Sequence, residues 1–262
     1  MSKTVKEIIA DSGHNLNFEV VEMLEKNKWN VEIGQYYVDD ITDKPREIDI
    51  VASKTIRADE FARDGYDPAR GDFYVNLFIE CKYFKELTVF WMRDKNPEKT
   101  LEAFKVEGMN LEQFLEVSQE KPHYFDFKTR VGKLFDGPVQ KDVMDAATTP
   151  LKSLTFFRDS RHQKGLYYPV VVYDGPGKLF NQDKGQEKNV IFEMNYSYRG
   201  RDGRIKEKEI FYIEFVPKEI FISFLTAIEK DIQQVRRVES HAYVQRMKSP
   251  PDRGISPHSE VR

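Results

Sequence analysis

The stretch LFIECK at residues 77–82 decides the fold, because it reads as a buried β-strand with charged residues near its end. Side chains two residues apart on a strand leave from the same face, so Glu80 and Lys82 lie side by side while Cys81 faces the other way. An acid and an amine on a mostly apolar strand are costly to bury unless they are paired or used. The stretch therefore marks a candidate site, and Cys81 is expected to be a small buried hydrophobic residue rather than a reactive thiol.

A second stretch, PREIDIV at residues 45–51, places Asp49 between two isoleucines and predicts another strand. Upstream, the spacing of Phe18, Val21 and Leu24 indicates one apolar face of a helix. The first half of the chain is therefore expected to hold one helix followed by three strands, at 15–28, 29–38, 46–53 and 75–84.

The second half of the chain predicts another core helix at 139–157, in which the spacing of Val143, Ala146, Ala147, Leu151 and Leu154 makes one apolar face. Pro150 should kink or split this helix. A continuous apolar run at 167–173 suits a strand that is buried on both faces. Two further strands flank a Gly-Arg-Asp-Gly turn, which is hairpin chemistry, and a final amphipathic helix follows them. These last three elements are expected at 189–199, 205–216 and 218–235.

The order helix, three strands, helix, strand predicts an α/β fold with a mixed β-sheet flanked by helices. We expect one domain over 1–235, extended by the C-terminal hairpin and helix and interrupted by insertions at 54–73 and 92–135. A short helix is predicted at 111–117 inside the second insertion. From residue 236 the apolar periodicity stops, so 236–262 is expected to be a disordered polar tail.

The composition narrows the function classes. The net charge is −3 at pH 7, whereas a domain that binds nucleic acid through its overall field would be basic, so contact with a polyanion must come from local patches. A single cysteine excludes an internal disulfide and a cysteine-based zinc finger. No apolar run approaches the roughly 20 residues needed to cross a bilayer, and the first residues lack the apolar segment of a secretory signal. We therefore expect a cytoplasmic protein without membrane contact.

The acidic residues and the lysine occur in an order that resembles a known family. They are Glu19 in the first helix, Asp49 in the second strand, and Glu80 and Lys82 in the third. This order resembles the PD-(D/E)XK nuclease superfamily, which has the restriction-endonuclease-like fold. The resemblance covers residues 15–83 and 139–175, with one departure, because Pro45 stands four residues before Asp49 instead of beside it.

The resemblance implies a function and a role for each residue. Asp49 and Glu80 would hold Mg²⁺, for which Mn²⁺ would substitute, together with the backbone carbonyl of Cys81. Glu19 would bind a second ion, directly or through a water molecule. Lys82 would orient the attacking water and stabilise the charge that develops on the phosphate. The implied activity is Mg²⁺-dependent endonucleolytic hydrolysis of DNA, in restriction, genome defence or repair.

Each of these residues also has a structural interpretation. Asp49 alone reads as an acid at a strand edge, and Glu19 as one of several helix glutamates. Glu80 and Lys82 alone read as an ion pair. The competing hypothesis is a nucleic-acid-binding or assembly protein that keeps this fold without catalysis, and either protein could act as a homodimer or with a partner subunit.

Two clusters of basic residues are candidates for contact with the phosphate backbone of DNA. Cationic side chains on protruding turns position a duplex without reading its sequence. A solvated turn is the alternative interpretation of each cluster. One cluster lies at the end of the second helix and beyond it, and the other surrounds the hairpin turn: Lys152, Arg158, Arg161 and Lys164, and Arg199, Arg201, Arg204 and Lys206.

Overall fold

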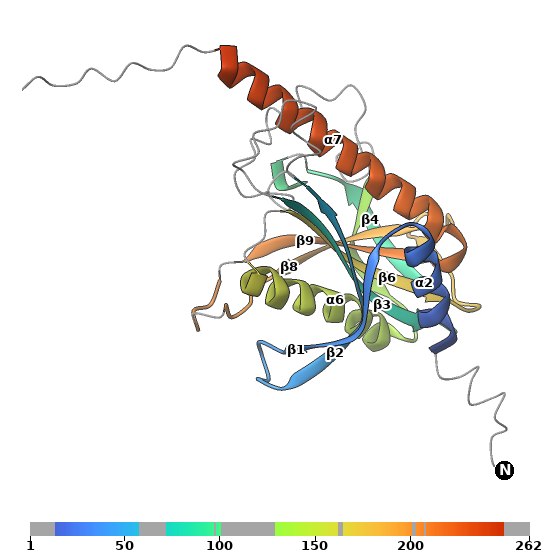
Figure 1. Ribbon diagram of the computed structural model, residues 1–262. Helices are drawn as coiled ribbons and strands as arrows, with labels where there is room; N and C mark the ends of the chain where they lie inside the picture. Colours follow the sequence, from blue (N-terminus) through green and yellow to red (C-terminus); the bar gives the residue numbers. More distant parts are fainter. Residues whose placement is uncertain are drawn as a thin grey trace, which may run out of the picture.

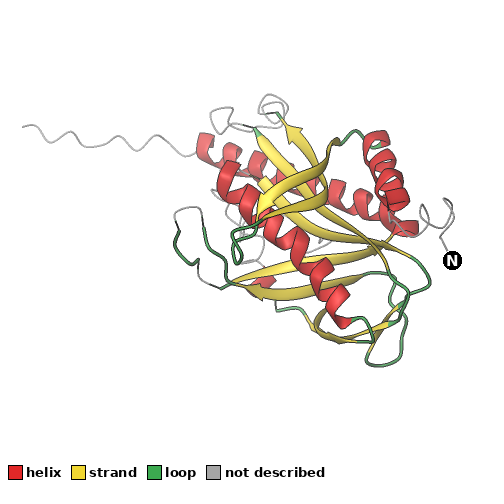
Figure 2. Ribbon diagram, turned by 90° about the horizontal axis from the view of Figure 1, so that it is seen from below, coloured by secondary structure: helices red, strands yellow, loops and turns green. Residues whose placement is uncertain are grey.

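A computed structural model describes residues 14–57, 72–96, 98–100, 129–161, 165–200, 203–206 and 208–248. Within these residues the strands form one nine-stranded sheet with helices on both faces (Figures 1 and 2). The predicted α/β class, a mixed sheet flanked by helices, is therefore confirmed. The predicted helix at 111–117 and most of the insertion at 54–73 lie outside the described residues.

The elements and their order in the sheet are as follows. The strands are β1 (Asn30–Val38), β2 (Pro45–Ile56), β3 (Phe73–Tyr83), β4 (Thr88–Asp94), β5 (Arg130–Asp136), β6 (Gly165–Asp174), β7 (Leu179–Asn181), β8 (Val190–Tyr196) and β9 (Glu209–Pro217). The helices are α2 (His14–Lys26), α6 (Gln140–Arg161), the 3₁₀ helix η3 (Lys218–Ile220) and α7 (Phe221–Lys248). Across the sheet the strands run in the order β1-β2-β3-β6-β9-β8-β5-β4-β7.

One half of this sheet positions the candidate site. β1, β2 and β3, the three consecutive strands expected in the first half of the chain, pair in antiparallel fashion. β6 pairs in parallel with β3, and β9 in parallel with β6. A parallel pair needs a crossover connection, and α6 lies within the connection from β3 to β6. The C-terminal ends of β3, β6 and β9 consequently meet at one edge of the sheet.

The sheet separates two hydrophobic clusters. α2 and α7 cover one face with residues such as Val20 and Phe221. α6 covers the opposite face with Val143, Ala147 and Leu151, which the sequence spacing had placed on one side of the helix. Figure 1 shows α6 and α7 on either side of the sheet. The central strands β3, β6 and β9 are thus packed on both faces.

The structure adds strands to the region 92–135, which the sequence predicted to be an insertion with one short helix. β4 ends in this region, and β5 begins in it and ends at Asp136. β4 buries Phe90 and Met92 and leaves Trp91 exposed. This alternation is too short to stand out beside the charged residues that follow it, so the sequence pattern did not reveal the strand.

The helices also differ in detail from the predictions. Phe18, expected on the apolar face of α2, is 63% exposed. α6 is continuous through Pro150, because its packing on the sheet outweighs the backbone hydrogen bond that a proline removes. α7 continues to Lys248, beyond residue 236 where the polar tail was expected to begin, since a helix anchored by packing can extend through polar residues. Among the described helices, none combines the length and apolar character that crossing a membrane requires.

The predicted hairpin is confirmed. β8 and β9 pair in antiparallel fashion from Val190–Phe215 to Tyr196–Glu209, and the bridge Arg199–Ile205 continues the pairing toward the turn.

Candidate functional site

β2 and β3 separate next to Asp49 and Glu80, two of the candidate site residues predicted from the sequence. The β2–β3 ladder ends at the pair Ile50–Ile79. Beyond that pair, β3 stays hydrogen-bonded to β6 and β2 stays hydrogen-bonded to β1. Asp49 and Glu80, the next residues along the two strands, therefore stand where the strands diverge. We call this point the fork.

A local irregularity in β2 orients the side chain of Asp49 toward the fork. On a regular strand Ile48 and Ile50 would share one face, yet they pack in the clusters on opposite faces of the sheet. In the neighbouring strand Gly34 has φ 65°, a left-handed conformation that only glycine adopts at little cost. Because of this irregularity, the Asp49 side chain does not follow the regular alternation of side chains between the two faces of the sheet.

Both oxygens of the Asp49 carboxylate accept hydrogen bonds in the fork. Oδ2 accepts from the backbone N–H of Cys81 at 2.8 Å, and Oδ1 accepts from the side-chain amide of Asn17 at 3.2 Å. The first bond satisfies a backbone donor where the β2–β3 ladder has ended. The second ties α2 to the fork and holds the carboxylate in place.

Glu80 and Lys82 form a close ion pair on the β3 face that carries α6. Lys82 Nζ lies 2.6 Å from Glu80 Oε1, and the two side chains are 38% and 9% exposed. Burial and then the charge of Asp49 raise the pKa of Glu80 to about 7, although the Lys82 ammonium works in the opposite direction. Burial lowers the pKa of Lys82, but the carboxylates of Glu80, Asp49 and Asp145 outweigh it and the net shift is upward. Asp49, Glu80 and Lys82 thus act on one another electrostatically.

Cys81 contributes its backbone rather than its thiol. Burial, followed by the charges of Asp49 and Glu80, raises the pKa of the thiol, so it stays protonated and unreactive at neutral pH. Its N–H faces Asp49. In an antiparallel ladder the N–H and C=O of one residue face the same neighbouring strand, so we expect the Cys81 carbonyl to face the fork as well.

Glu19 is engaged elsewhere. Its carboxylate, 49% exposed, lies 2.9 Å from the ammonium of Lys218. Lys218 follows β9 and also contacts Asp174, at the end of β6, at 2.7 Å. The structure therefore pairs Glu19 with a lysine of this chain, whereas the resemblance implied a metal ion or a metal-bound water.

The donor groups at the fork fit a hard divalent cation held by few protein ligands. The charge of Asp49 helps to raise the pKa of Glu80, so a cation bound by both would relieve their repulsion. Mg²⁺ keeps several waters and is commonly held by one or two carboxylates. Within the described ranges, no three His, Cys, Asp or Glu side chains are grouped to hold a metal. The two carboxylates at the fork therefore suit a cation that keeps most of its bound water molecules.

The first basic cluster is largely engaged inside the protein. Lys152 Nζ lies 2.7 Å from the buried carboxylate of Asp39, and Arg158 Nη2 lies 2.8 Å from Glu209. Neither side chain is available for a phosphate without breaking these contacts. The other two members lie at the end of α6 and outside the described residues: Arg161 and Lys164.

The cluster around the hairpin turn is more exposed. The Arg199 side chain is 53% exposed, and its guanidinium lies 3.8 Å from Asp43, beyond hydrogen-bond distance. Arg204 is exposed and Lys206 half-buried, while Arg201 lies outside the described residues. Of the two clusters, the hairpin is the better candidate for contact with a polyanion.

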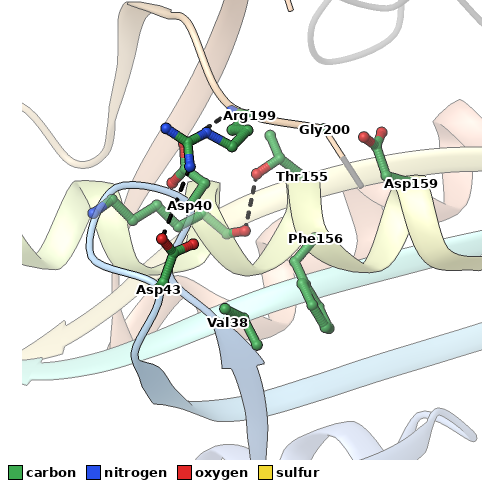
Figure 3. A pocket seen from close by; sticks show the side chains of 9 residues that line it. Val38, Asp40, Asp43, Thr155, Phe156, Asp159, Arg199 and Gly200 are labelled. Atoms are coloured by element: carbon green, nitrogen blue, oxygen red, sulfur yellow. Dashed lines mark hydrogen bonds and ion pairs between the residues drawn. The ribbon is translucent and has the colours of Figure 1, made fainter. Parts of the chain in front are cut away.

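A pocket with a volume of about 170 Å³ lies between the β1–β2 turn, α6 and the hairpin (Figure 3). The Arg199 backbone N–H donates to Asp40 at 3.3 Å on one side of it, and Val38 and Phe156 supply apolar surface. More carboxylates than cations line the pocket, so it does not suit a phosphate group. The charged residues concerned are Asp40, Asp43, Asp159, Lys152 and Arg199.

Sequence reasoning did not assign Asn17, Asp174 or Lys218 to the site. Asn17 is a helix residue with no distinctive signal. Asp174 is the last residue of β6, and Lys218 directly follows β9. Polar residues at the end of a buried strand are the signal that could have found them, because ligands gather at the C-terminal ends of parallel strands.

Comparison of the chain with protein-family models, with curated proteins and with solved structures found no match. A functional assignment must therefore be argued from the residues and their geometry.

Proposed function

We propose that the protein is a divalent-cation-dependent deoxyribonuclease with a restriction-endonuclease-like core. The observation that carries the proposal is the fork, where Asp49 from β2 accepts a hydrogen bond from the Cys81 N–H of β3 and acts electrostatically on the Glu80–Lys82 ion pair. The element order supports it too, because α2, β1, β2, β3, α6 and β6 follow the order of the superfamily that the sequence resembles, with β4 and β5 inserted between β3 and α6.

The residues of the fork have separable roles in this proposal. A cation held by Asp49 and Glu80 would polarise the scissile phosphate and lower the pKa of a water bound to it. Asp49 keeps its orientation through the hydrogen bonds from Cys81 and Asn17. Lys82, which is partly exposed, stabilises negative charge that develops on the phosphate. Glu80 must be ionised to bind a cation, so its raised pKa makes cation binding dependent on pH near neutrality.

DNA is the proposed substrate, and the β8–β9 hairpin is the proposed contact with its backbone. Arg199 and Arg204 are exposed on this hairpin and would contact phosphate oxygens. Contacts of this kind contribute a salt-dependent affinity that is independent of sequence.

A DNA-binding or assembly protein without catalysis is the second candidate. Two observations favour it. Glu19 is already paired with Lys218, and the Glu80–Lys82 pair satisfies both of its charges without a ligand.

Cleavage of supercoiled plasmid by the purified full chain separates the two candidates. With Mg²⁺ or Mn²⁺ the protein should nick and linearise the plasmid, and EDTA should stop the reaction. Asp49→Asn, Glu80→Gln and Lys82→Ala should each abolish cleavage, whereas Glu22→Gln, on the exposed surface of α2, should retain it. Absence of EDTA-sensitive cleavage across a range of divalent ions would favour the non-catalytic protein.

DNA affinity, measured by fluorescence anisotropy, separates effects on DNA binding from effects on cleavage. Asp49→Asn and Glu80→Gln should bind DNA as well as the wild type or better, because they remove negative charge facing the phosphates. Arg199→Ala should weaken binding in a salt-dependent way and leave the chemical step unchanged.

A further inference from the structure

The pocket between the β1–β2 turn, α6 and the β8–β9 hairpin has an acidic lining that its own cations do not neutralise. Lys152 is matched by the buried carboxylate of Asp39, 2.7 Å away. Arg199 is the other cation among the described residues of the lining, which also holds three carboxylates: Asp40, Asp43 and Asp159. Within the part of the chain that the structure describes, the pocket therefore carries two negative charges without a counter-charge.

The three carboxylates have acceptor capacity left for a ligand. Asp40 accepts from the Tyr196 hydroxyl at 2.8 Å and from the backbone N–H of Arg199 at 3.3 Å, and both donors are neutral. Asp43 is 73% exposed and lies 3.8 Å from the Arg199 guanidinium, beyond hydrogen-bond distance. Asp159 is half-buried, and no hydrogen bond or ion pair joins its carboxylate to another described residue. Since an ionised carboxylate has about four lone-pair sites, each of the three can accept further donors.

One face of α6 sets the spacing of the charges along the pocket. Lys152 and Asp159 both line the pocket and lie two turns apart, which is about 10 Å along the helix axis. In Figure 3 the two carboxylates of the β1–β2 turn lie toward one end of the pocket and Asp159 toward the other. Val38 and Phe156 supply apolar surface between these ends. The pocket thus has an anionic group at each end and an apolar middle.

A short linear aliphatic diamine matches this arrangement. Its terminal ammonium groups would donate to the carboxylates at the two ends, while its methylene groups pack on Val38 and Phe156. Its two positive charges equal the excess negative charge of the lining. The pocket volume of about 170 Å³ is below the roughly 300–1,000 Å³ of pockets for drug-sized ligands, so a short chain suits it. A metal ion would leave the apolar middle unused.

We propose that this pocket binds an aliphatic diamine or polyamine, with one ammonium at Asp40 and Asp43 and another at Asp159. The inference is independent of the proposed cation site, because no residue of the fork lines the pocket.

Isothermal titration calorimetry of the full chain with putrescine tests the proposal. At constant ionic strength, putrescine should bind saturably at one site per chain. Butylamine has the same stem with one ammonium and should bind at least about tenfold more weakly, because one charge-assisted contact is lost. The corresponding uncharged diol should not bind. Equimolar Mg²⁺ should not displace putrescine, since the apolar stem contributes to its binding.

Variants of the full chain locate the site. Asp159→Asn and Asp43→Asn should each weaken putrescine binding about tenfold, because each removes a charged acceptor. Asp183→Asn is the matched control, because it removes an exposed carboxylate that pairs with Arg130, and it should leave the affinity unchanged. Absence of saturable binding, equal affinity for putrescine and butylamine, or displacement by equimolar Mg²⁺ would overturn the proposal. An Asp159→Asn variant that is folded by circular dichroism and binds putrescine as tightly as the wild type would overturn it too.

Discussion

Glu80→Gln should alter the stability of the protein in a pH-dependent way. The pKa of Glu80 is raised from 4.5 to about 7, so between these pH values the folded state holds a proton that the unfolded state has lost. The stabilisation from this proton is complete below the unfolded pKa and disappears as the pH rises through 7. At about 1.4 kcal/mol per pH unit, the free energy of unfolding falls by about 3 kcal/mol over this range through Glu80 alone.

Glutamine resembles the neutral carboxyl group and does not titrate, so the difference between variant and wild type isolates Glu80. The two proteins should be about equally stable near pH 5, and the variant more stable by up to about 3 kcal/mol near pH 8. Glu80→Gln also removes the attraction between the Glu80 carboxylate and the Lys82 ammonium. This loss does not reverse the expected result, because the raised pKa of Glu80 already includes the effect of Lys82. Urea denaturation at several pH values in EDTA measures the difference. A stability difference that does not grow with pH, or a variant less stable than the wild type near pH 8, would refute the argument.

Further predictions concern hydrogen bonds and ion pairs at and around the site. Asp49→Ala leaves the Cys81 N–H without its acceptor and should lower the free energy of unfolding by about 1–3 kcal/mol. Asp49→Asn keeps an acceptor oxygen and should lower it less, so equal losses in thermal denaturation would contradict the assigned hydrogen bond. Lys152→Met leaves the buried Asp39 carboxylate without its ammonium and should cost about 3 kcal/mol or more in urea denaturation. Arg199→Ala breaks the long, exposed ion pair with Asp43 and should change the free energy of unfolding by less than about 1 kcal/mol. Similar losses in Lys152→Met and Arg199→Ala would refute the distinction between a buried and an exposed ion pair.

The order of the elements could be predicted from the sequence because helical and strand periodicities are local. The apolar run at 167–173 became the two-sided strand β6, and the spacing of Val143, Ala147 and Leu151 became the buried face of α6. β4 and β5 could not be predicted in the same way, because each has only a few alternating residues and their pairing partners lie elsewhere in the chain. The continuity of α6 through Pro150 also depended on tertiary packing.

The candidate site also has features that the sequence predicts and features that only the tertiary structure decides. The sequence alone determined that Glu80 and Lys82 share a face, because residues two apart on a strand must do so. The approach of Asp49 to Cys81 depended on how β2 and β3 separate. Only the tertiary structure decided that Glu19 pairs with Lys218. Buried and half-buried charges require partners, and the partners are chosen by proximity in the folded chain, which the spacing along the sequence does not specify.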